Sequence, residues 1–553
     1  MRNYRLLLSM RSLVWVMTMI VVTLQMHPAR AIAGDAVPGI DAADEDPILH
    51  SLYTRPGAAL LWSAAGQLTG QARQLIALLQ TADAWGLEPA DYGADLLAAE
   101  AGRLSSASTP ADWAAFDALL SRATVRFISH LHYGRVDPRA AGFELDEPRK
   151  DLDVMTSVVS LASSVDVRGS LNAVEPRFLH YGLLKAALAK YAALQGDPTL
   201  TAIPGTAGRK LHVGDGYAGA PALRRLLTAL GDLPAAVAAP ATDPILDAAL
   251  VGALKRFQSR HGLAADGILD SRLAALLATP LTVPVEQIKL TLERWRWLPP
   301  FDTPPIIVNI PQFRLFAFQT VEDRAASIMQ MDVIVGQAYP RKQTPVFLAE
   351  MRYVIFRPYW DVPRSITLRE MLPKLHKNPG YLQKNNLEIV RGASDESPAL
   401  PPDAAALAAL TSGEARLRQR PGADNALGLI KFMFPNVHDV YLHSTPEHQL
   451  FLRSNRAFSH GCIRVSDPVA LAAFVLRNAD GVWDTARIDA AMQQGPDSFR
   501  VELRTPIRVM VLYGTAQATE AGPVLFFNDI YGQDRKLETL LNEARARHGS
   551  TGR

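Results

Sequence analysis

The sequence predicts a multidomain α+β protein, in which helical segments come first and a β-rich domain follows. The chain has 553 residues, a length that corresponds to about three or four domains. From about Asp46 to Gly196, apolar residues recur at three- and four-residue spacing, which is typical of amphipathic helices. From Ile306 onward the chain is rich in β-branched and aromatic residues and is interrupted by glycine and proline, which indicates strands and turns.

The composition narrows the functional classes. Hydrophobic residues make up 48% of the chain and charged residues 20%, as in ordinary globular proteins. The formal net charge is +2 and no long basic run is present, which argues against nucleic acid as the main partner. The chain has one cysteine, Cys462, so it cannot form an internal disulfide, and cysteine usage does not identify the compartment.

The N-terminal 33 residues have the pattern of an export signal. Three arginines precede an apolar run from Leu13 to Leu24, and the small-residue sequence Ala31-Ile32-Ala33 follows. The run is shorter than the ~20 residues that a membrane-spanning helix needs. We expect residues 1–33 to be a signal cleaved after Ala33, with an uncleaved membrane anchor as the alternative. In either case the rest of the chain would face the periplasm.

Residues 46–200 are expected to form one helical domain without a catalytic cluster. Its helical patterns lie at Gln71 to Trp85, Trp113 to His130 and Arg177 to Leu194. His130 and His132 are expected to be packing or surface residues, because no carboxylate or cysteine cluster accompanies them.

Residues 210–280 are expected to form a second, smaller helical module. Its compact core would surround the turn Asp266-Gly267. The expected core residues are Phe257, Leu263, Ile268 and Leu273. The alternative is a helical spacer that binds nothing.

A β-rich domain is expected over 300–515. Strands are predicted at Ile306 to Phe318, Ile328 to Val335, Tyr353 to Phe356 and Thr505 to Tyr513, and a helix at Pro468 to Asn478. Residues 361–425 interrupt the strand pattern and look like an excursion that leaves the sheet and returns at GLIKFMFPN. Residues 516–553 should add C-terminal strands, at Val524 to Phe527, and a charged tail that is either helical or disordered.

Cys462 is the first candidate for chemistry. Ser459 to Val465 has the pattern of a short strand, so His460, Cys462 and Arg464 would project from one face. Asp439 to His443 alternates in the same way, with Tyr441 and His443 pointing away from the core. His443 lies 19 residues before Cys462, so a turn near Ser444 and a return segment would have to bring the two strands together as neighbours.

A nearby histidine would give this thiol a function. A free thiol has a pKa near ~8.5 and is only a few per cent ionised at neutral pH, so it needs a base. Two alternatives remain open: an inert buried cysteine, and a zinc site that uses Cys462 with His438, His443, His448 or His460. Gly461, the two near histidines and Arg464 favour a reactive thiol over an inert one. No CxxC or HExxH pairing supports a metal, and no cofactor is expected.

These residues resemble a known family. The sequence SHGCIRV, preceded by the histidine of YLHSTP, resembles the active-site signature of the L,D-transpeptidases, whose catalytic domain is of the YkuD type. Many members carry asparagine where this chain has Arg464, and the large multidomain YcbB-like branch commonly has arginine there. The segment HYGRVDP resembles the scaffold domain of that branch, and 210–279 resembles the peptidoglycan-binding module of type 1.

The resemblance implies cysteine acyl transfer on peptidoglycan stem peptides and glycan. Cys462 would be the nucleophile and His443 the general base, its tautomer fixed by a carbonyl near Ser444. The amides of Gly461 and Cys462, with His460, would stabilise the oxyanion. Arg464 would hold a substrate carboxylate or form a salt bridge. Further substrate contacts are expected from Ser459, Tyr441 and Trp360, and the insertion 361–425 would form a capping subdomain that excludes water.

Two other functions remain open at this level. The same site could release its acyl group to water, as an L,D-carboxypeptidase or endopeptidase does. The chain could also be a non-catalytic wall-binding protein, although intact Cys462, His443 and His460 argue against that. No protein partner is predicted.

Overall fold

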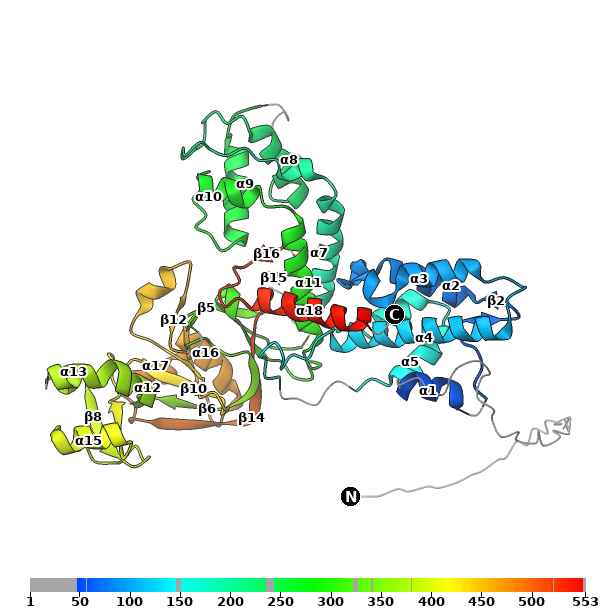
Figure 1. The fold of residues 1–553 in the computed structure, drawn as a ribbon. Helices are drawn as coiled ribbons and strands as arrows, with labels where there is room; N and C mark the ends of the chain where they lie inside the picture. Colours follow the sequence, from blue (N-terminus) through cyan, green and yellow to red (C-terminus); the bar gives the residue numbers. More distant parts are fainter. Residues whose placement is uncertain are drawn as a thin grey trace, which may run out of the picture.

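The structure is a computed structural model that describes residues 47–550, apart from 56, 146–150, 235–242, 322–326, 340–341, 379 and 521. The predicted export signal at 1–33 lies outside the described residues. Figure 1 shows a helical arm on one side, a second helical unit above the centre and a β-rich domain on the other side. The multidomain α+β class predicted from the sequence is confirmed.

The helical arm packs around one hydrophobic core that includes Trp62, Trp85 and Phe127. Its longest helix, α4 (Pro110–Tyr133), begins at a capping box in which Thr109 and Asp112 satisfy each other's backbone amides. The other elements of the arm are α1 (Pro47–Thr54), β1 (Ser63–Ala64), β2 (Gln67–Leu68), α2 (Gly70–Gln80), η1 (Ala82–Trp85), η2 (Pro89–Tyr92), α3 (Ala94–Arg103), α5 (Val154–Ala162) and α6 (Val167–Asn172). The helices expected at Gln71 to Trp85 and at Trp113 to His130 are therefore present. The first of them ends at Gln80, and a separate 3₁₀ turn, η1, follows it.

The second helical unit contains the predicted small module and the two helices on which it packs. Of the four predicted core residues, Phe257 and Leu273 are buried and Leu263 packs at the edge of the core. The prediction for Ile268 is wrong, because Leu269 enters the core where its backbone pairs with Leu211. The elements are α7 (Leu179–Gln195), η3 (Pro198–Thr201), α8 (Ala220–Leu230), α9 (Ala248–Arg260), α10 (Ser271–Leu277), α11 (Thr282–Arg296), β15 (Ala516–Gln517) and β16 (Leu525–Phe526).

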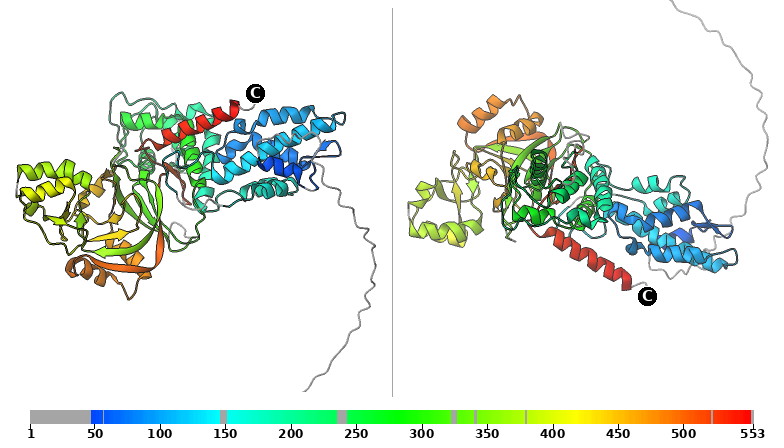
Figure 2. Two further views of the ribbon diagram at one scale, coloured as in Figure 1. Left: turned by 60° about the horizontal axis from the view of Figure 1, so that its bottom comes forward. Right: turned by 90° about the horizontal axis from the view of Figure 1, so that it is seen from above.

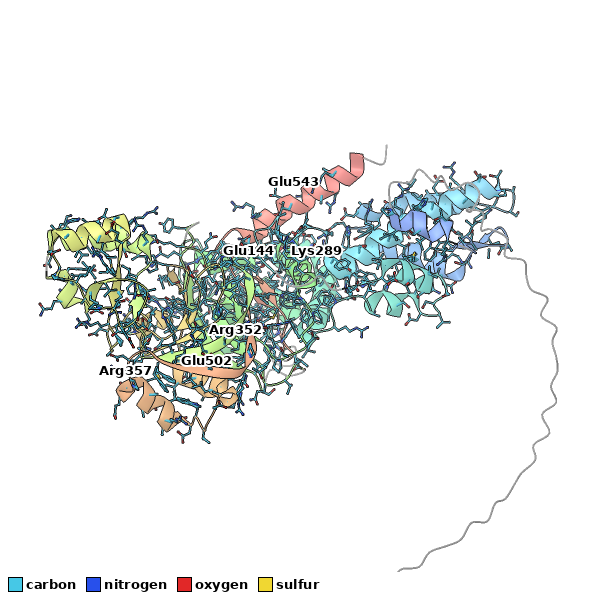
Figure 3. All side chains as sticks on the ribbon, turned by 90° about the horizontal axis from the view of Figure 1, so that it is seen from below. Glu144, Lys289, Arg352, Arg357, Glu502 and Glu543 are labelled. Carbon is cyan, nitrogen blue, oxygen red and sulfur yellow. The ribbon has the colours of Figure 1, made fainter. Side chains whose placement is uncertain are left out.

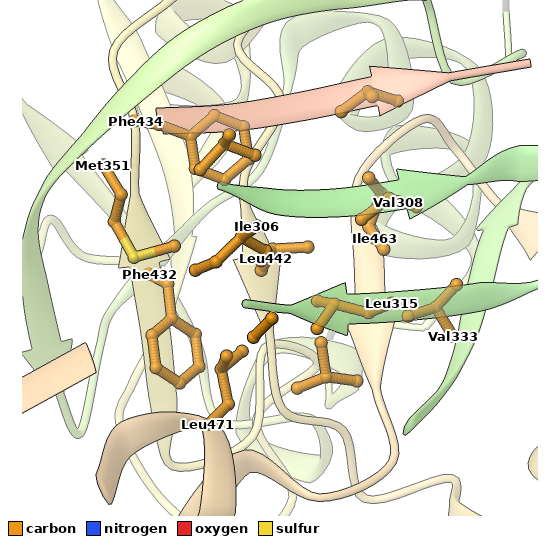
Figure 4. Close-up of a cluster of buried hydrophobic side chains, with 14 of the residues drawn as sticks. Ile306, Val308, Leu315, Val333, Met351, Phe432, Phe434, Leu442, Ile463 and Leu471 are labelled. Carbon is orange, nitrogen blue, oxygen red and sulfur yellow. The ribbon is translucent and has the colours of Figure 1, made fainter. Parts of the chain in front are cut away.

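The β-rich domain is a closed barrel. Its nine-stranded sheet has the order β12-β5-β13-β11-β10-β6-β14-β3-β4, and β4 also pairs with β5, so the sheet closes and β12 lies outside the ring. The interior is filled by apolar side chains such as Val308, Phe432 and Ile463 (Figure 4). The strands are β3 (Ile306–Asn309), β4 (Arg314–Ala317), β5 (Met329–Gly336), β6 (Phe347–Phe356), β10 (Ile430–Met433), β11 (Leu442–His443), β12 (Ala457–Ser459), β13 (Ile463–Val465) and β14 (Phe499–Leu512).

The single strand predicted over Ile306 to Phe318 is a hairpin. The 3₁₀ turn η5 (Ile310–Gln312) separates β3 from β4, because Pro311 has no N–H for a ladder and Phe313 adopts a left-handed φ of 55°. Helices then cover the barrel, with Leu471 and Val475 of α16 in its core. The remaining elements are η7 (His448–Leu452), α16 (Pro468–Val475), η8 (Leu476–Asn478), α17 (Thr485–Gln494) and α18 (Gln533–Ser550), so the charged tail is helical.

The insertion forms a subdomain with its own core. Its sheet has the order β7-β9-β8, and residues such as Ile389 and Leu417 are buried within it. The elements are β7 (Trp360–Asp361), α12 (Arg364–Ile366), the π-helical η6 (Thr367–Met371), α13 (Leu372–Lys377), α14 (Tyr381–Lys384), β8 (Leu387–Arg391), α15 (Ala404–Ser412) and β9 (Ala415–Gln419). Both views in Figure 2 place this subdomain at the end of the molecule opposite the helical arm.

Helix α11 joins the arm and the second unit through buried charges, and Leu290 of the same helix packs in the core of the barrel. Glu293 and Arg296 are both at most 1% exposed, and their side chains are 3.3 Å apart. Glu293 also accepts from Arg135 at 3.3 Å, and Arg296 donates to the Tyr181 hydroxyl at 3.1 Å. In Figure 3, Lys289 marks α11 at this junction, Glu144 marks the segment that leads from the arm to the barrel, and Glu543 marks α18. Because each of these charges is paired, its burial is tolerated.

Within the described part of the chain, no single helix has the length and apolar composition to cross a membrane. The bent pair α10 and α11, with a 70° break, passes that test together on length and composition alone.

Replacing Gly134 with alanine should destabilise the protein by about 2–3 kcal/mol, because an added Cβ strains the backbone and opens the α11 junction. Gly134 has a φ of 82°, and a Cβ there would lie 2.6 Å from Trp297 Nε1 and 2.8 Å from Glu293 Oε1. Urea unfolding of Gly134→Ala beside Gly196→Ala measures this. Gly196 has a φ of −70° and no described atom within 4 Å of such a Cβ. Equal stabilities of the two variants would contradict the packing argument.

Candidate active site

Three strands place basic side chains in one row on the outer surface of the barrel. Strand β11 pairs in parallel with β13, with His443 opposite Arg464. On its other side β11 pairs with β10, with Lys431 opposite His443. The neighbouring residues Ile430, Leu442 and Ile463 point into the core, so the three basic residues point outward. The adjacency of the two strands predicted from the sequence is therefore confirmed.

Cys462 lies in a bend, and not on a strand as predicted. Strand β12 ends at Ser459, β13 begins at Ile463, and Gly461 between them has a φ of 130°. A residue with this φ cannot continue an extended strand. Glycine can adopt the angle because it has no side chain. Cys462 stays beside β11, where Ile463 N–H donates to Tyr441 O at 3.1 Å. His460 is turned away from this row toward the insertion.

Ser459 holds the bend. It is 4% exposed, its hydroxyl donates to Cys462 O at 2.6 Å, and it accepts from Gly461 N–H at 3.1 Å. The Gly461 N–H is therefore already hydrogen-bonded to Ser459 in this structure. This corrects the expectation that it donates to an oxyanion. Thr344 adds a second brace by donating to Gly461 O at 2.7 Å. Ser459 therefore shapes the loop, and the expectation that it also contacts the substrate stays a prediction.

His443 is buried and neutral. Its Nδ1 lies 2.5 Å from the Ser444 carbonyl oxygen, the kind of partner expected from the sequence. Burial, the Arg464 guanidinium and the Lys431 ammonium lower the pKa of His443 to about 3. A neutral ring that donates from Nδ1 carries its lone pair on Nε2, so His443 can accept a proton there.

The Cys462 thiol is protonated at rest. Burial raises the pKa of Cys462 above its ordinary value, although hydrogen bonds from Tyr441 act in the opposite direction. Its Sγ donates to the Asp439 carbonyl oxygen at 3.6 Å. Burial and the interaction with Cys462 raise the pKa of Tyr441 well above its usual range. Tyr441 thus contacts the sulfur, a contact that the sequence analysis did not predict, and its expected contact with the substrate stays a prediction.

Lys431 is a site residue that the sequence analysis missed. Burial lowers the pKa of Lys431, and the charges of Asp361, Asp395 and Cys462 oppose that shift. Its Nζ lies 5.7 Å from the centre of the Tyr441 ring. A signal was present, because Lys431 is the polar residue between the apolar residues Ile430 and Phe432 of a strand. Lys431 lies next to His443 because β10 pairs with β11, and the sequence alone does not show which strands pair.

His460 links the active-site bend to the insertion. Its Nε2 lies 2.9 Å from Glu370 Oε1, on the π-helical turn η6, and 2.9 Å from Lys342 Nζ. Lys342 also pairs with Glu370 at 3.2 Å. Although burial acts in the opposite direction, the hydrogen bonds from His460 and Lys342 hold the pKa of Glu370 below its usual range. The insertion therefore contacts the loop that carries Cys462.

Arg464 and Trp360 were also expected to contact the substrate, and in the structure each has a partner within the chain. Arg464 pairs with Glu447, which is the salt bridge considered as an alternative to a substrate contact. Trp360 lies on β7 opposite Gln419 and packs against the core of the insertion. His438 lies 3.1 Å from Glu144. Among the residues described, no group of three or more His, Cys, Asp or Glu side chains is placed to hold a metal ion.

Three segments of the chain match known protein families. Residues 304–507 match the L,D-transpeptidase catalytic domain, 218–277 match a "putative peptidoglycan binding domain", and 47–188 match a scaffold domain. A curated relative, the "Putative L,D-transpeptidase" of Haemophilus influenzae, is 30% identical over 253 residues. That match covers 46% of this chain and 49% of the relative, so the chain spans about half the length of that protein.

The barrel with Cys462 in its bend is thus an L,D-transpeptidase catalytic domain. This domain, at residues 304–507, is of the YkuD type, and the same chain carries segments that match scaffold and peptidoglycan-binding domains.

The rate of Cys462 alkylation by iodoacetamide should rise with pH without a plateau near neutrality, because the raised thiol pKa leaves the sulfur protonated there. Lys431→Met should slow the reaction at pH 7 by roughly tenfold, since loss of one nearby positive charge raises the thiol pKa by about one unit. Mass spectrometry of the alkylated protein measures both. Lys384→Met, on the exposed surface of α14, is the control and should react like the parent. A plateau below pH 7 would indicate a thiolate–imidazolium pair instead.

Proposed function

We propose that this protein is a peptidoglycan L,D-transpeptidase that cross-links third-position diamino acids of stem peptides through a thioester on Cys462. The observation that carries the proposal is the environment of His443. Its Nδ1 is held by the Ser444 carbonyl, and its strand runs parallel to the strand that follows Cys462. A neutral base on the strand next to the bend that carries the chain's one cysteine is the arrangement that thiol acyl transfer needs.

In the first step, the Cys462 sulfur attacks the carbonyl carbon of the third residue while its proton passes to His443 Nε2. The tetrahedral adduct collapses by breaking the peptide bond to the terminal D-alanine. The leaving amine takes the proton from His443, and the thioester remains. Since the thiol pKa is raised and the His443 pKa is about 3, both groups are neutral before substrate binds. Proton transfer therefore accompanies attack and does not precede it.

In the second step, the side-chain amine of a diamino acid on another stem attacks the thioester. His443 accepts the proton of that amine and returns it to the departing thiolate of Cys462. The new amide bond is the cross-link, and the free thiol is restored. The step needs an amine acceptor instead of water, so the outcome depends on how well the site excludes water.

The row of basic side chains fits a substrate with carboxylates. Lys431 and Arg464 flank His443 on the barrel surface, and a stem peptide carries carboxylates close to its reacting carbonyl. Lys431 would hold such a substrate, whereas Arg464 is already paired with Glu447, and both cations keep His443 neutral. The peptidoglycan-binding domain would add attachment to the glycan polymer. We place this activity in the periplasm, where stem peptides are found, in accordance with the export signal expected at 1–33.

Replacing Cys462 with alanine should abolish cross-links between third-position residues while the fold is retained, because the thiol contributes little packing. His443→Ala should slow acylation by a factor on the order of 10² to 10⁴. Mass spectrometry of muropeptides after incubation with a tetrapeptide donor and a diamino acid acceptor measures both effects, with circular dichroism as the fold control. Cross-linking by the Cys462→Ala protein would falsify the proposal. Donor consumption that yields only hydrolysed product would identify an L,D-carboxypeptidase instead.

The insertion is proposed to act as a cap that keeps water from the thioester. The contact that supports this role is the Glu370–His460–Lys342 cluster, which joins η6 to the bend before Cys462. The two carboxylate contacts are partly exposed, so each contributes about 0.2–1 kcal/mol.

Glu370→Gln should raise the ratio of hydrolysed to cross-linked product by about two- to fivefold, because the neutral amide holds His460 and Lys342 less firmly. Replacing residues 363–422 with a short Gly/Ser bridge should raise that ratio further while Cys462 can still be acylated. The same muropeptide assay reads out both proteins. Glu396→Gln, on the exposed surface of the insertion, should leave the ratio unchanged. An unchanged ratio in the shortened protein would rule out the cap.

A further inference from the structure

An apolar cavity lies where the helical parts meet the barrel, well away from Cys462. Its volume is about 140 Å³, and its walls come from the start of α7, the end of α11, strands β3 to β5 and strands β15 and β16. Figure 1 shows β15 and β16 beside α11 at this junction. Gln330 of β5 lines the cavity, whereas Gly336, at the other end of β5, pairs with Ser459 of the active-site loop. Six residues of strand separate the two places by roughly 20 Å.

Six of the twenty residues that line the cavity are aromatic, His180 included. Phe178 lies 5.6 Å from Trp295 and 4.9 Å from Phe301, measured between ring centres. Phe316 and Phe318 form a separate buried cluster on the barrel side. The cavity is comparable in volume to an engineered cavity of about 150 Å³ that stays dry and binds benzene in another protein. It therefore has room for a single substituted ring.

Two polar atoms in this wall have no partner. His180 Nδ1 and Gln517 Oε1 are shielded from bulk solvent, and neither has a hydrogen-bond partner among the described residues. His180 donates its other ring N–H to the Ala518 carbonyl, and burial lowers the pKa of His180, so the ring is neutral and Nδ1 is an acceptor. Both unpaired atoms thus require a donor. A buried acceptor without a donor is costly, so native structures usually supply one.

We propose that this cavity is a ligand site for a neutral aromatic ring that carries a hydroxyl or N–H donor, such as a phenol or an indole. The ring packs among Phe178, Trp295 and Phe318, and its donor binds His180 Nδ1 or Gln517 Oε1. The cavity is separate from the row of basic side chains formed by Lys431, His443 and Arg464 on β10, β11 and β13. Because its walls belong to the second helical unit and to the barrel, an occupied site also holds these two parts together.

The test compares three probes of nearly equal shape: phenol, which has a donor, anisole, which has only an acceptor, and toluene, which has neither. Isothermal titration calorimetry on the whole chain measures their affinities. We expect phenol to bind roughly tenfold tighter than toluene, which corresponds to one buried hydrogen bond. Toluene is the more apolar probe, so a purely apolar cavity would give the opposite order. Phenol should bind Cys462→Ala with the same affinity as it binds the parent.

Matched variants locate the donor contact. Gln517→Met keeps the side-chain length and removes the acceptor, so the preference for phenol over toluene should fall at least threefold and the melting temperature should rise. His180→Phe is the second variant, in case the first does not fold. Gln383→Met, on the exposed surface of α14, is the control and should retain the preference. Equal binding of all three probes, tighter binding of anisole than of phenol, or no binding at millimolar concentration would each overturn the proposal.

Discussion

The parallel pairing of β11 with β13 is the constraint on which the candidate site depends. Strand β11 has only two residues, and it is fixed on both sides, by β10 and by β13. That register sets His443 between Lys431 and Arg464 and leaves Cys462 at the point where the chain enters β13. A slip of one residue would turn His443 into the barrel core and Leu442 to the surface. Burial of Leu442 and Ile463 therefore fixes the geometry of the candidate site through ordinary hydrophobic packing.

The same surroundings explain why the two reacting groups are neutral at rest. His443 is buried between positive charges, so protonation is unfavourable, and the buried thiol gains little from its weak hydrogen bonds. Substrate carboxylates near Lys431 and Arg464 would offset part of that positive charge. Imidazolium would then become easier to form when a substrate is present. Under the proposed mechanism, the Cys462 sulfur would then react faster when a substrate is bound, and its protonated form would resist oxidation when the site is empty.

The sequence was sufficient to predict those elements that depend on residues close together in the chain. Alternation in Asp439 to His443 and the turn residues after it were enough to predict neighbouring strands, because each side of a strand must match its surroundings. The continuous strand over Ser459 to Val465 was wrong because one glycine angle, that of Gly461, redirects the chain without any change in composition. Glu370 could not be found at all. It lies 90 residues before His460 in sequence, and only the folded insertion brings the two together.

Helix α11 has a mechanical consequence for the function proposed above. Its residues enter both cores: Ile288 and Leu292 pack in the second helical unit, while Leu290 and the following Trp297 pack with the barrel. Its 15 residues form a rod of about 22 Å whose rotation is blocked by the buried Glu293 and Arg296. If the binding domain holds a glycan strand as proposed, that strand would be presented to the barrel at one fixed distance and angle. The helix would then select neighbouring strands by their spacing as well as by their chemistry.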